Sequence, residues 1–269
     1  MILELLEYLA TPASRLARSM GFLKSALQVR ARFLRCRQPW RPHLEHTRAL
    51  ILQAASLCPT RRKAVLFGAG LLHDIPLKEL SALFQEVVLV DIVHPLSSRF
   101  AAWRQGNVRQ VSLDVTGVMD KIFAAQKQPG APLPISFPEA FCTDSDLDLS
   151  VSVNLLSQLA WVSSQHLATT HPAPVLDTFY RHLLEAHLDY LQRLPGHTAL
   201  ITDSRWTRHS VDGAFSETWD VLHGVTLPTL AQQWTWAIAP APEREAGYDF
   251  TANVVGYPDW KQTSRTEHA

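Results

Sequence analysis

Apolar residues follow two different periods along the chain. In the first quarter they recur every three or four positions, as between Leu44 and Leu57, which places them on one side of a helix. Residues 1–57 are therefore predicted to form two or three amphipathic helices, interrupted at Pro42. We expect residues 1–58 to be a helical segment that caps the rest of the chain or docks on it.

From Lys63 onward, short continuous apolar runs replace the helical spacing. Such runs are typical of buried parallel strands. Five of them are predicted strands, at 63–67, 87–92, 108–115, 147–156 and 197–203. Helical patterns separate several of these runs, at about 77–84, 96–104, 117–127 and 175–194.

Two further strands are predicted near the end of the chain, at 233–239 and 248–257. Only prolines and a charged turn separate them, so there is no room for a helix and the two should pair antiparallel. Residues 128–139 and 206–228 lack either period and are expected to be loops. The chain is thus predicted to be an α/β protein, in which residues 59–262 form a mostly parallel sheet with a C-terminal antiparallel hairpin, preceded by the N-terminal helices.

The composition is that of a protein with one large core. The chain has 269 residues, of which 46% are apolar, and this is enough for one main domain. Its net charge is zero, but Met1–Lys63 holds 12 Lys and Arg against three Asp and Glu, which leaves 13 against 22 for the remainder. A basic segment beside an acidic body is suited to dock on that body. It is also suited to bind a protein partner or a second copy and, less readily, nucleic acid.

Three cysteines, Cys36, Cys58 and Cys142, are too few and too widely spaced for a disulfide framework, which favours a reducing compartment. Glu4 and Glu7 interrupt the apolar stretch at the start of the chain, so this stretch does not resemble a signal peptide. No run approaches the ~20 apolar residues of a membrane span. We therefore expect a cytoplasmic protein without a membrane span.

Three strand ends carry residues suited to a nucleotide. Gly68-Ala69-Gly70 ends the first predicted strand, where small residues let a ligand approach the backbone N–H groups. Asp91 ends the second strand, 23 residues after Gly68, where a carboxylate can accept hydrogen bonds from ribose hydroxyls. Asp114 ends the third strand, 23 residues further on, and is suited to an adenine amino group. Because ligands of open α/β sheets bind outside the carboxyl ends of the strands, this ordered trio predicts a nucleotide site.

These features resemble the Rossmann-like S-adenosylmethionine-dependent methyltransferases over about residues 60–257. AVLFGAG is similar to the glycine motif of that family, VVLVDI to its ribose-binding acidic strand, NVRQVSLDVT to its adenine-contacting strand and DLSVSVNLLSQL to the strand beside the transferred methyl group. The resemblance implies seven strands with a final antiparallel hairpin, S-adenosyl-L-methionine as cofactor and a small-molecule acceptor. It also implies cofactor contacts from residues at three strand ends, namely Gly68, Ala69, Gly70, Asp91, Ile92, Asp114 and Val115.

The chain departs from the family pattern around the glycine turn. Leu66 stands where the family commonly has an acid, and Leu72 where it has a third glycine. His73 and Asp74 are candidates for the missing polar contacts, although Asp74 also suits a helix N-cap. The departures leave open a catalytically degenerate binding or assembly protein, and an aminocarboxypropyl transferase that uses the same cofactor. An NAD(P)-dependent oxidoreductase is less favoured, because its third glycine would fall at His73.

Two residues are the leading candidates for catalysis. Asn154 follows the apolar run of the fourth strand and is placed either to orient an acceptor or to bond the backbone of the turn. His166, in a predicted loop beyond that strand, is a candidate base. His171 in the same loop and Asp203 at the end of the fifth strand are weaker candidates.

Twelve histidines raise the question of a metal site. His43 and His46 share a helical face at i and i+3, but neither has a nearby cysteine or a convincing third ligand. No metal is therefore predicted. Trp234 and Trp236 alternate on a predicted strand and are expected to line a pocket or to join the core. The chain has neither a P-loop nor a G-x-S-x-G motif, so phosphotransferase and hydrolase functions have no support.

Overall fold

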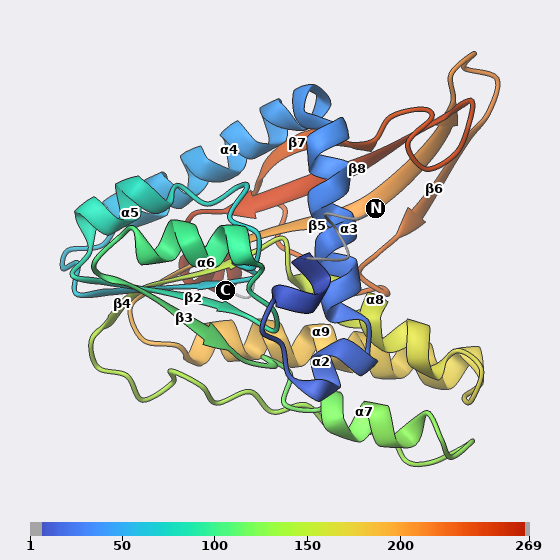
Figure 1. Ribbon diagram of the computed structural model, residues 1–269, viewed down its shortest axis with the longest axis horizontal. Coiled ribbons are helices and arrows are strands. Elements are labelled where there is room, and N and C mark those ends of the chain that lie inside the picture. Colours follow the sequence, from blue (N-terminus) through green and yellow to red (C-terminus); the bar gives the residue numbers. More distant parts are fainter. Residues whose placement is uncertain (1–6, 267–269) are drawn as a thin grey trace.

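One sheet of eight strands forms the centre of the molecule, in the order β3-β2-β1-β4-β5-β8-β7, with β6 paired to β5. The computed structural model describes residues 7–266 (Figure 1). The part of the predicted N-terminal helices that falls on residues 1–6 lies outside the described residues. The strands are β1 Lys63–Phe67, β2 Glu86–Asp91, β3 Val108–Ser112, β4 Leu147–Val153, β5 His197–Ser210, β6 Ser216–Asp220, β7 Gln232–Ala239 and β8 Tyr248–Tyr257.

The directions of the strands confirm the predicted fold class. β1 to β5 pair in parallel, whereas β8 runs antiparallel to β5 and β7 runs antiparallel to β8. This strand order with a reversed final pair is that of the Rossmann-like methyltransferase fold. A doubly wound dinucleotide-binding sheet has the order 3-2-1-4-5-6 instead. The fold therefore does not support the oxidoreductase alternative.

Helices cover both faces of the sheet (Figure 1). Because successive strand residues point to opposite faces, Leu66 of β1 packs with one layer of helices while Phe67 contacts Tyr190 on the other. The first layer consists of α4 (Arg37–Ser56), α5 (Leu77–Leu83) and α6 (Leu96–Trp103). The second consists of α7 (Met119–Ala125), α8 (Leu156–Leu167), α9 (Ala173–Arg193) and α10 (Trp260–Thr266).

The N-terminal segment is helical, but Pro42 does not interrupt it as predicted. α2 spans Arg15–Ser19 and α3 spans Phe22–Arg35, and Pro42 lies inside α4. Proline has no N–H, so Pro42 costs the helix one hydrogen bond, since the backbone ladder already begins at Trp40 N–H, which donates to Cys36 O. The apolar side of α4 packs in the core with β1 and β4, which offsets this cost.

Residues 206–228 are only in part the irregular segment that was predicted, because 206–210 and 216–220 are strands, whereas 211–215 and 221–228 are irregular. β5 continues to Ser210, and β6 pairs antiparallel with this extension. β4 pairs with β5 only as far as Ile201, so this edge of β5 is open beyond that residue, and β6 pairs with it there. Trp206 and Trp219 meet across the pair, with ring centroids 6.4 Å apart. β6 is largely exposed and the extension of β5 is mostly half-buried, so no alternation of apolar and polar residues marks either strand in the sequence.

Residues 156–167 form helix α8, where a loop was predicted. The strand before it, β4, ends at Val153 rather than at residue 156. The buried positions of α8 follow helical spacing, at Leu156, Leu159, Ala160, Ser163 and Leu167. The polar Ser163 inside this buried set and the exposed Trp161 obscured the period.

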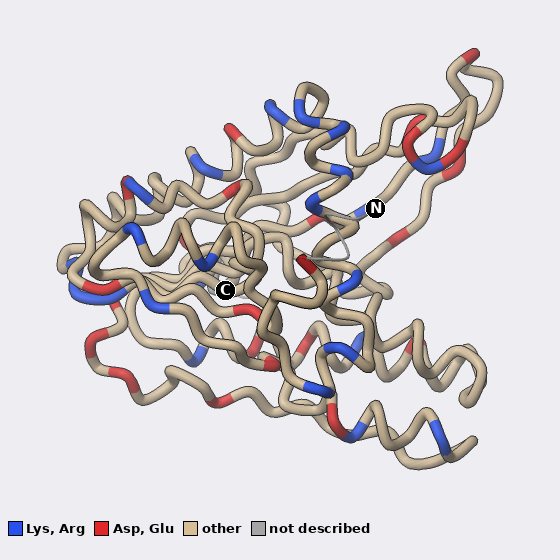
Figure 2. The backbone as a smooth tube through the Cα atoms, viewed as in Figure 1, with Lys and Arg blue, Asp and Glu red and all other residues tan. Residues whose placement is uncertain are grey.

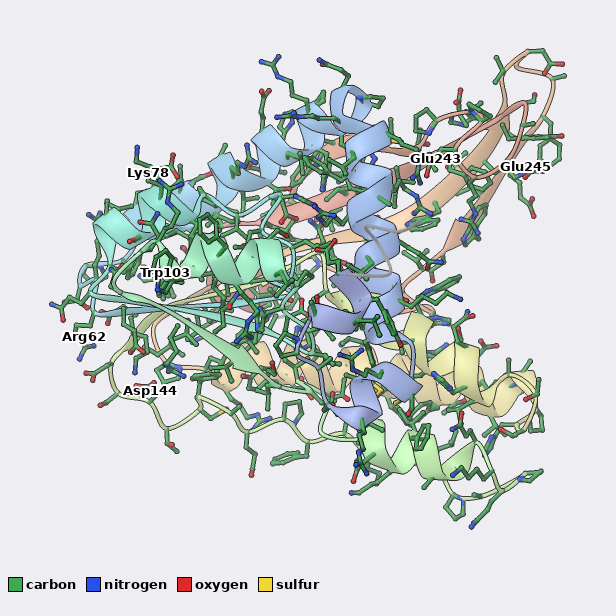
Figure 3. The ribbon with its side chains drawn as sticks, viewed as in Figure 1. Arg62, Lys78, Trp103, Asp144, Glu243 and Glu245 are labelled. Atoms are coloured by element: carbon green, nitrogen blue, oxygen red, sulfur yellow. The ribbon has the colours of Figure 1, made fainter. Side chains whose placement is uncertain are left out.

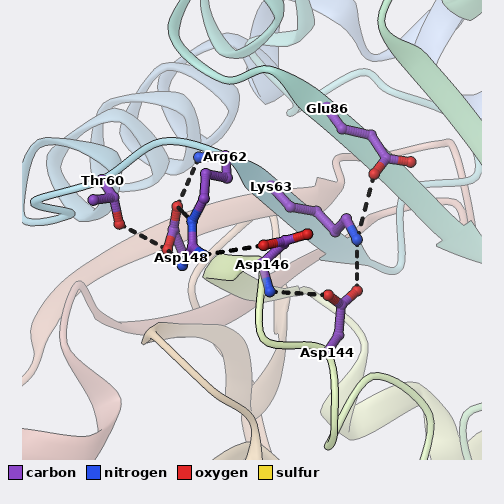
Figure 4. Close-up of polar contacts among 7 residues, drawn as sticks. All are labelled: Thr60, Arg62, Lys63, Glu86, Asp144, Asp146 and Asp148. Carbon is purple, nitrogen blue, oxygen red and sulfur yellow. Dashed lines mark hydrogen bonds and ion pairs between the residues drawn. The ribbon is translucent and has the colours of Figure 1, made fainter.

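Polar contacts tie β1 and β4 together at their amino ends, away from the edge that carries the glycine turn. Asp148 accepts hydrogen bonds from Thr60 Oγ1 at 2.8 Å, from the Arg62 backbone N–H at 2.6 Å and from Arg62 Nη2 at 2.7 Å (Figure 4). Lys63 Nζ lies 2.7 Å from Asp144. The Arg62 guanidinium holds the pKa of Asp148 down to about 2.

Asp148→Asn is expected to lower the unfolding free energy by about 2 kcal/mol at pH 7, because the charge that strengthens these hydrogen bonds is lost. Urea denaturation measures the difference. Asp146→Asn is the matched control. Asp146 is 60% exposed and lies 3.0 Å from the same arginine, so its neutralisation should cost under about 0.5 kcal/mol. Equal losses in the two variants would contradict a special role for Asp148.

The three cysteines are unpaired, with Cys36 and Cys58 buried and Cys142 partly buried. Burial raises the pKa of Cys58 to about 11, so it is a thiol at neutral pH. Within residues 7–266, no helix is both long enough and apolar enough to cross a membrane.

Candidate functional site

The glycine turn lies where β1, β2 and β4 end. Gly68 has a φ of 80° and lies so close to β4 that a Cβ there would be 2.4 Å from Val153 O. At Gly70, a Cβ would be 2.7 Å from Asp91 Oδ2 and 2.8 Å from Val93 O. Both positions therefore require glycine, because other parts of the chain lie against them. The approach of a ligand to the backbone of this turn stays a prediction. The turn brings Gly70 directly against the predicted ribose-binding carboxylate.

The two departures from the family pattern differ in their structural effect. Leu72 has a φ of 63°, the left-handed conformation that glycine adopts most readily. The backbone at position 72 thus keeps the conformation that favours glycine, although the residue is leucine. Leu66 is fully buried in the core. Its position offers no polar contact to a ligand.

Asp91 and His94 place two hydrogen-bond acceptors near the end of β2. Asp91 is half-buried, and the N–H groups of Gly70 and Val93 donate to it. Burial raises the pKa of Asp91, although His94 opposes this shift. His94 is buried, and its Nε2 donates to Val111 O at 3.1 Å. Its Nδ1 has no partner among the described residues. Sequence analysis missed His94, for which the only signal was its place three residues after Asp91.

The N-terminal helices cover this end of β2. Leu23 and Leu27 of α3 pack in one apolar cluster with Val93, and Ile92 lies against the same cluster. Figure 1 shows α3 rising from α2 to the start of α4 across this end of the sheet. The predicted cofactor contact Ile92 is therefore partly buried beneath a helical cap.

Asp114 orders the segment that follows β3. Its Oδ1 accepts hydrogen bonds from Thr116 N–H at 2.9 Å and Thr116 Oγ1 at 2.6 Å, and its Oδ2 accepts one from Met119 N–H at 2.9 Å. Val115 is buried in the core beside α7. The carboxylate thus fixes the start of α7, and its contact with adenine stays a prediction.

Asn154 meets residues from distant parts of the chain. It occupies the turn between β4 and α8 with a φ of 48°, a conformation that asparagine adopts more readily than most residues. Its Nδ2 lies 2.8 Å from Asp74 Oδ2 and 3.4 Å from His43 Nε2. Trp234 Nε1 donates to His43 Nδ1 at 3.0 Å, and the His43 ring stacks on Trp236 with centroids 4.0 Å apart. We call Trp234, His43, Asn154 and Asp74 the Asn154 cluster.

Sequence analysis placed Asn154 correctly beside the strand ends but missed the partnership with His43. Asp74 is not a helix cap, because α5 begins at Leu77 with Pro76 before it. Burial is the largest influence on Asp74 and raises its pKa. Burial also lowers the pKa of His43 to about 3. The sequence offered one indication that His43 is buried, because it lies next to Leu44 among the apolar positions of the predicted helix.

His166 does not take part in this site. It lies in the last turn of α8, and its ring nitrogens are 2.8 Å from Gln126 Oε1 and 3.1 Å from Met20 O. It therefore connects α8 to the segment between α2 and α3. This geometry corrects the loop placement, and a role of His166 as a base stays a prediction.

The two weaker candidates are also engaged within the protein. His171 Nε2 lies 2.9 Å from Ala131 O, which holds the predicted loop 128–139 against the end of α8. Asp203 is buried and accepts hydrogen bonds from Ser157 Oγ and Trp206 Nε1. Burial raises the pKa of Asp203. These contacts give both residues a structural role.

The basic N-terminal segment makes ion pairs with acids of the same chain. Arg35 binds Glu243 through two hydrogen bonds of 2.6 and 2.8 Å. Glu243 lies in the connection between β7 and β8 (Figure 3). Arg30 pairs with Glu7 at 2.8 Å, and Arg48 donates to His73 O. Figure 2 shows Lys and Arg spread along α3 and α4. Part of the basic charge is thus neutralised by docking within the chain.

No protein-family model matches this chain, and no curated protein sequence matches it. Solved structures give weak similarities. The N-methyltransferase NodS from Bradyrhizobium japonicum WM9 is 10% identical, with a TM-score of 0.37 over 83% of this chain and 99% of that one. The Burkholderia thailandensis 1,6-didemethyltoxoflavin-N1-methyltransferase, solved with bound 1,6-didemethyltoxoflavin and S-adenosylhomocysteine, is 15% identical, with a TM-score of 0.35 over 88% and 90% of the two chains. The DhpI-SAM-HEP complex is 12% identical, with a TM-score of 0.36 over 90% and 99%. The fold assignment therefore depends on the strand order and pairing.

Proposed function

We propose that this chain is an S-adenosyl-L-methionine-dependent transferase that methylates a small molecule. The observation that carries the proposal is the contact between the Gly68–Gly70 turn and Asp91, at the adjoining carboxyl ends of β1 and β2. This contact places small residues, which let a ligand approach the backbone, beside a carboxylate suited to ribose hydroxyls. Both lie in a sheet with the methyltransferase strand order.

The glycine turn and Asp91 support cofactor binding at the nucleoside end, because they join small residues to a carboxylate. We assign contacts with it to Gly68, Ala69 and Gly70 of the turn, to Asp91 and Ile92 at β2, and to Asp114 and Val115 after β3. The bound cofactor supplies the electrophilic methyl group. Methyl transfer then requires the acceptor atom to lie ~3–3.5 Å from that carbon in the correct line. We assign this orienting role to Asn154, at the end of β4.

Calorimetric titration with S-adenosylhomocysteine tests the proposal. Wild-type protein is expected to bind it, and Asp91→Ala should weaken binding about 10- to 100-fold, because ribose hydroxyls lose a charged partner. Asp120→Ala, at an exposed position of α7, is the control and should bind normally. Absence of wild-type binding, or normal binding by Asp91→Ala, would count against the proposal.

A second candidate is a degenerate methyltransferase fold that serves as a binding or assembly protein. The observation that favours it is the Asn154 cluster, because side chains of the chain itself occupy the space beside Asn154. The same titration separates the two, since a degenerate fold would not bind the cofactor product. An aminocarboxypropyl transferase would bind it too, but would release methylthioadenosine during turnover.

We also propose that residues 59–262 form the cofactor-binding domain and that residues 1–58 act as its cap. The packing of α3 on Ile92 and Val93 supports the cap. The unpaired cysteines support a reducing compartment, and we propose the cytoplasm.

A further inference from the structure

Helix α6 has the reverse of the usual arrangement of side chains. A helix on the surface of a protein normally turns its large apolar residues toward the core. α6 instead buries Ser98 and Ala102, at 2% and 4% exposure, whereas Leu96, Phe100 and Trp103 are 39%, 59% and 77% exposed. Trp103 lies at the end of the helix (Figure 3). The fold therefore leaves the large apolar side chains of this helix outside the core.

These three side chains form one stripe. They stand at positions i, i+4 and i+7, the spacing that places residues on one side of a helix. The rings of Phe100 and Trp103 stack, with centroids 5.9 Å apart and planes inclined at 29°. Single exposed apolar residues are common on protein surfaces, whereas contiguous groups mark interaction sites. We call Leu96, Phe100 and Trp103 the α6 stripe.

Basic residues flank the α6 stripe. Residues 92–113 contain three arginines and no acid. Arg109 is bound to Glu86 at 3.0 Å. Arg99 and Arg104 are exposed, and neither forms an ion pair with a residue that the structure describes. The partner of this face is therefore expected to carry negative charge.

The same sign of charge extends over the first layer of helices. Figure 2 shows Lys and Arg along α4, α5 and α6. With Arg104, which caps α6, these helices expose six basic side chains and two acidic ones, namely Arg37, Arg41, Glu45, Arg48, Lys78, Glu79, Arg99 and Arg104. A broad anionic surface would thus be attracted by the layer as a whole and not by α6 alone.

Area and charge favour a lipid surface over a protein partner. At these exposures the α6 stripe offers roughly 300–400 Å² of apolar area, if a large side chain presents about 150–250 Å². A stable protein interface needs about 800 Å² on each partner. A symmetric dimer through the stripe would also bring together Arg99 and Arg104 of both copies. A bilayer requires no such area, because aromatic rings enter its interface while arginine side chains reach its phosphates.

A nucleic-acid strand fits the α6 stripe less well than a bilayer does. Phe100 and Trp103 could stack on bases, but they already stack on one another. Leu96 has no aromatic face to offer a base, whereas it suits lipid chains as well as the two rings do. The combination of leucine, phenylalanine and tryptophan with flanking arginines is typical of segments that lie in the membrane interface.

We propose that the α6 stripe inserts into the headgroup region of an anionic lipid bilayer, with Arg99 and Arg104 bound to lipid phosphates. The binding is peripheral and reversible, because three side chains of one short helix reach only the interface. It depends on both terms, since the apolar area is small and the attraction of the arginines is screened by salt. The cofactor takes no part in this contact, so the proposal is independent of the proposed function.

Co-sedimentation with lipid vesicles tests the apolar part of the proposal. Wild-type protein is expected to bind vesicles of phosphatidylcholine with about 30% phosphatidylserine, and to bind pure phosphatidylcholine at least about 10-fold more weakly. Trp103→Ala should weaken binding to the anionic vesicles about 10-fold, because the largest inserted side chain is lost. Trp161→Ala is the matched control. Trp161 is 57% exposed but lies on α8, in the second layer, so this variant should bind as wild type.

A second pair of variants tests the basic part. Arg99→Gln/Arg104→Gln should weaken binding to the anionic vesicles about 30-fold, at about fivefold for each arginine. Lys121→Gln/Lys127→Gln removes the same charge from exposed positions in α7 and just after it, and should bind as wild type. The difference between the two double variants separates local contact with phosphates from an effect of net charge.

The proposal is overturned if wild-type protein does not bind the anionic vesicles, or if Trp103→Ala binds them as tightly as Trp161→Ala. Sedimentation velocity and titration with a fluorescent oligouridylate examine the other occupants. A dimer that Trp103→Ala dissociates, or RNA binding that it removes in place of vesicle binding, would also overturn the proposal. Should Trp103→Ala fail to fold, the comparison of Arg99→Gln/Arg104→Gln with wild type still decides the matter.

Discussion

Gly68→Ala is expected to lower the unfolding free energy by about 2–5 kcal/mol, the sum of left-handed backbone strain and a steric overlap. The added Cβ would lie 2.4 Å from Val153 O and 3.2 Å from Leu155 Cβ at a φ of 80°. Neither neighbour moves easily, because β4 is paired on both sides, with β1 and β5. Urea denaturation at pH 7 measures the loss. S-Adenosylhomocysteine binding should also be lost, because β1 and β4 separate at the glycine turn.

Gly213→Ala is the matched control for this variant. Gly213 has a φ of 75°, close to that of Gly68, but nothing lies within 4 Å of the added Cβ. It should therefore cost only the backbone strain, about 1–2 kcal/mol. If the two variants lost equal stability, the close approach of the glycine turn to β4 would have no energetic consequence. The assignment of Gly68 to the junction of three strands would then fail.

Acidification from pH 7 to pH 5 is expected to destabilise the protein through two buried histidines. Burial lowers the pKa of His187 to about 4 and that of His43 to about 3. The unfolded chain takes up protons near the ordinary histidine pKa of about 6.5 while the folded protein does not. Stability is therefore complete above that pH and falls as the pH drops toward the folded-state values. Each residue contributes a loss of about 2 kcal/mol at pH 5.

His187→Gln isolates one of these contributions. His187 is 1% exposed and lies 3.0 Å from Ser152 Oγ through Nε2, a contact that the glutamine amide reproduces. Between pH 7 and pH 5 the variant should lose about 2 kcal/mol less than wild type, as measured by urea denaturation at each pH. His182→Gln, at an exposed position of the same helix, should follow wild type. A wild-type pH dependence in His187→Gln would show that folding does not lower the pKa of His187.

The fold was predictable because each element carries its own period. Apolar runs such as 87–92 and the closing pair of strands led directly to the α/β sheet, and the structure confirms its strand directions. The errors lie where burial is incomplete. β6 is largely exposed, and α8 has Ser163 among its buried residues. In both segments the hydrophobic pattern therefore fails to predict the strand or helix that forms.

The candidate site was only partly predictable. Gly68, Gly70 and Asp91 could be placed together because the carboxyl ends of neighbouring parallel strands meet at one edge of the sheet. The structure shows Gly70 in contact with Asp91. His166 was misplaced because α8 was not recognised, and its ring points toward Met20 instead. Asp74 was named only as one of two possible substitutes for the missing acid.

The sequence by itself determined the order of elements, the glycine turn and the residues at the strand ends, because these follow from local spacing and from the rule that ligands bind at one edge of the sheet. Only the tertiary structure decided the hydrogen-bond partners. His43 and Asn154 are 111 positions apart, and Trp234 is 191 positions from His43. No local pattern encodes such contacts, because the packing of α4 against β4 and β7 creates them.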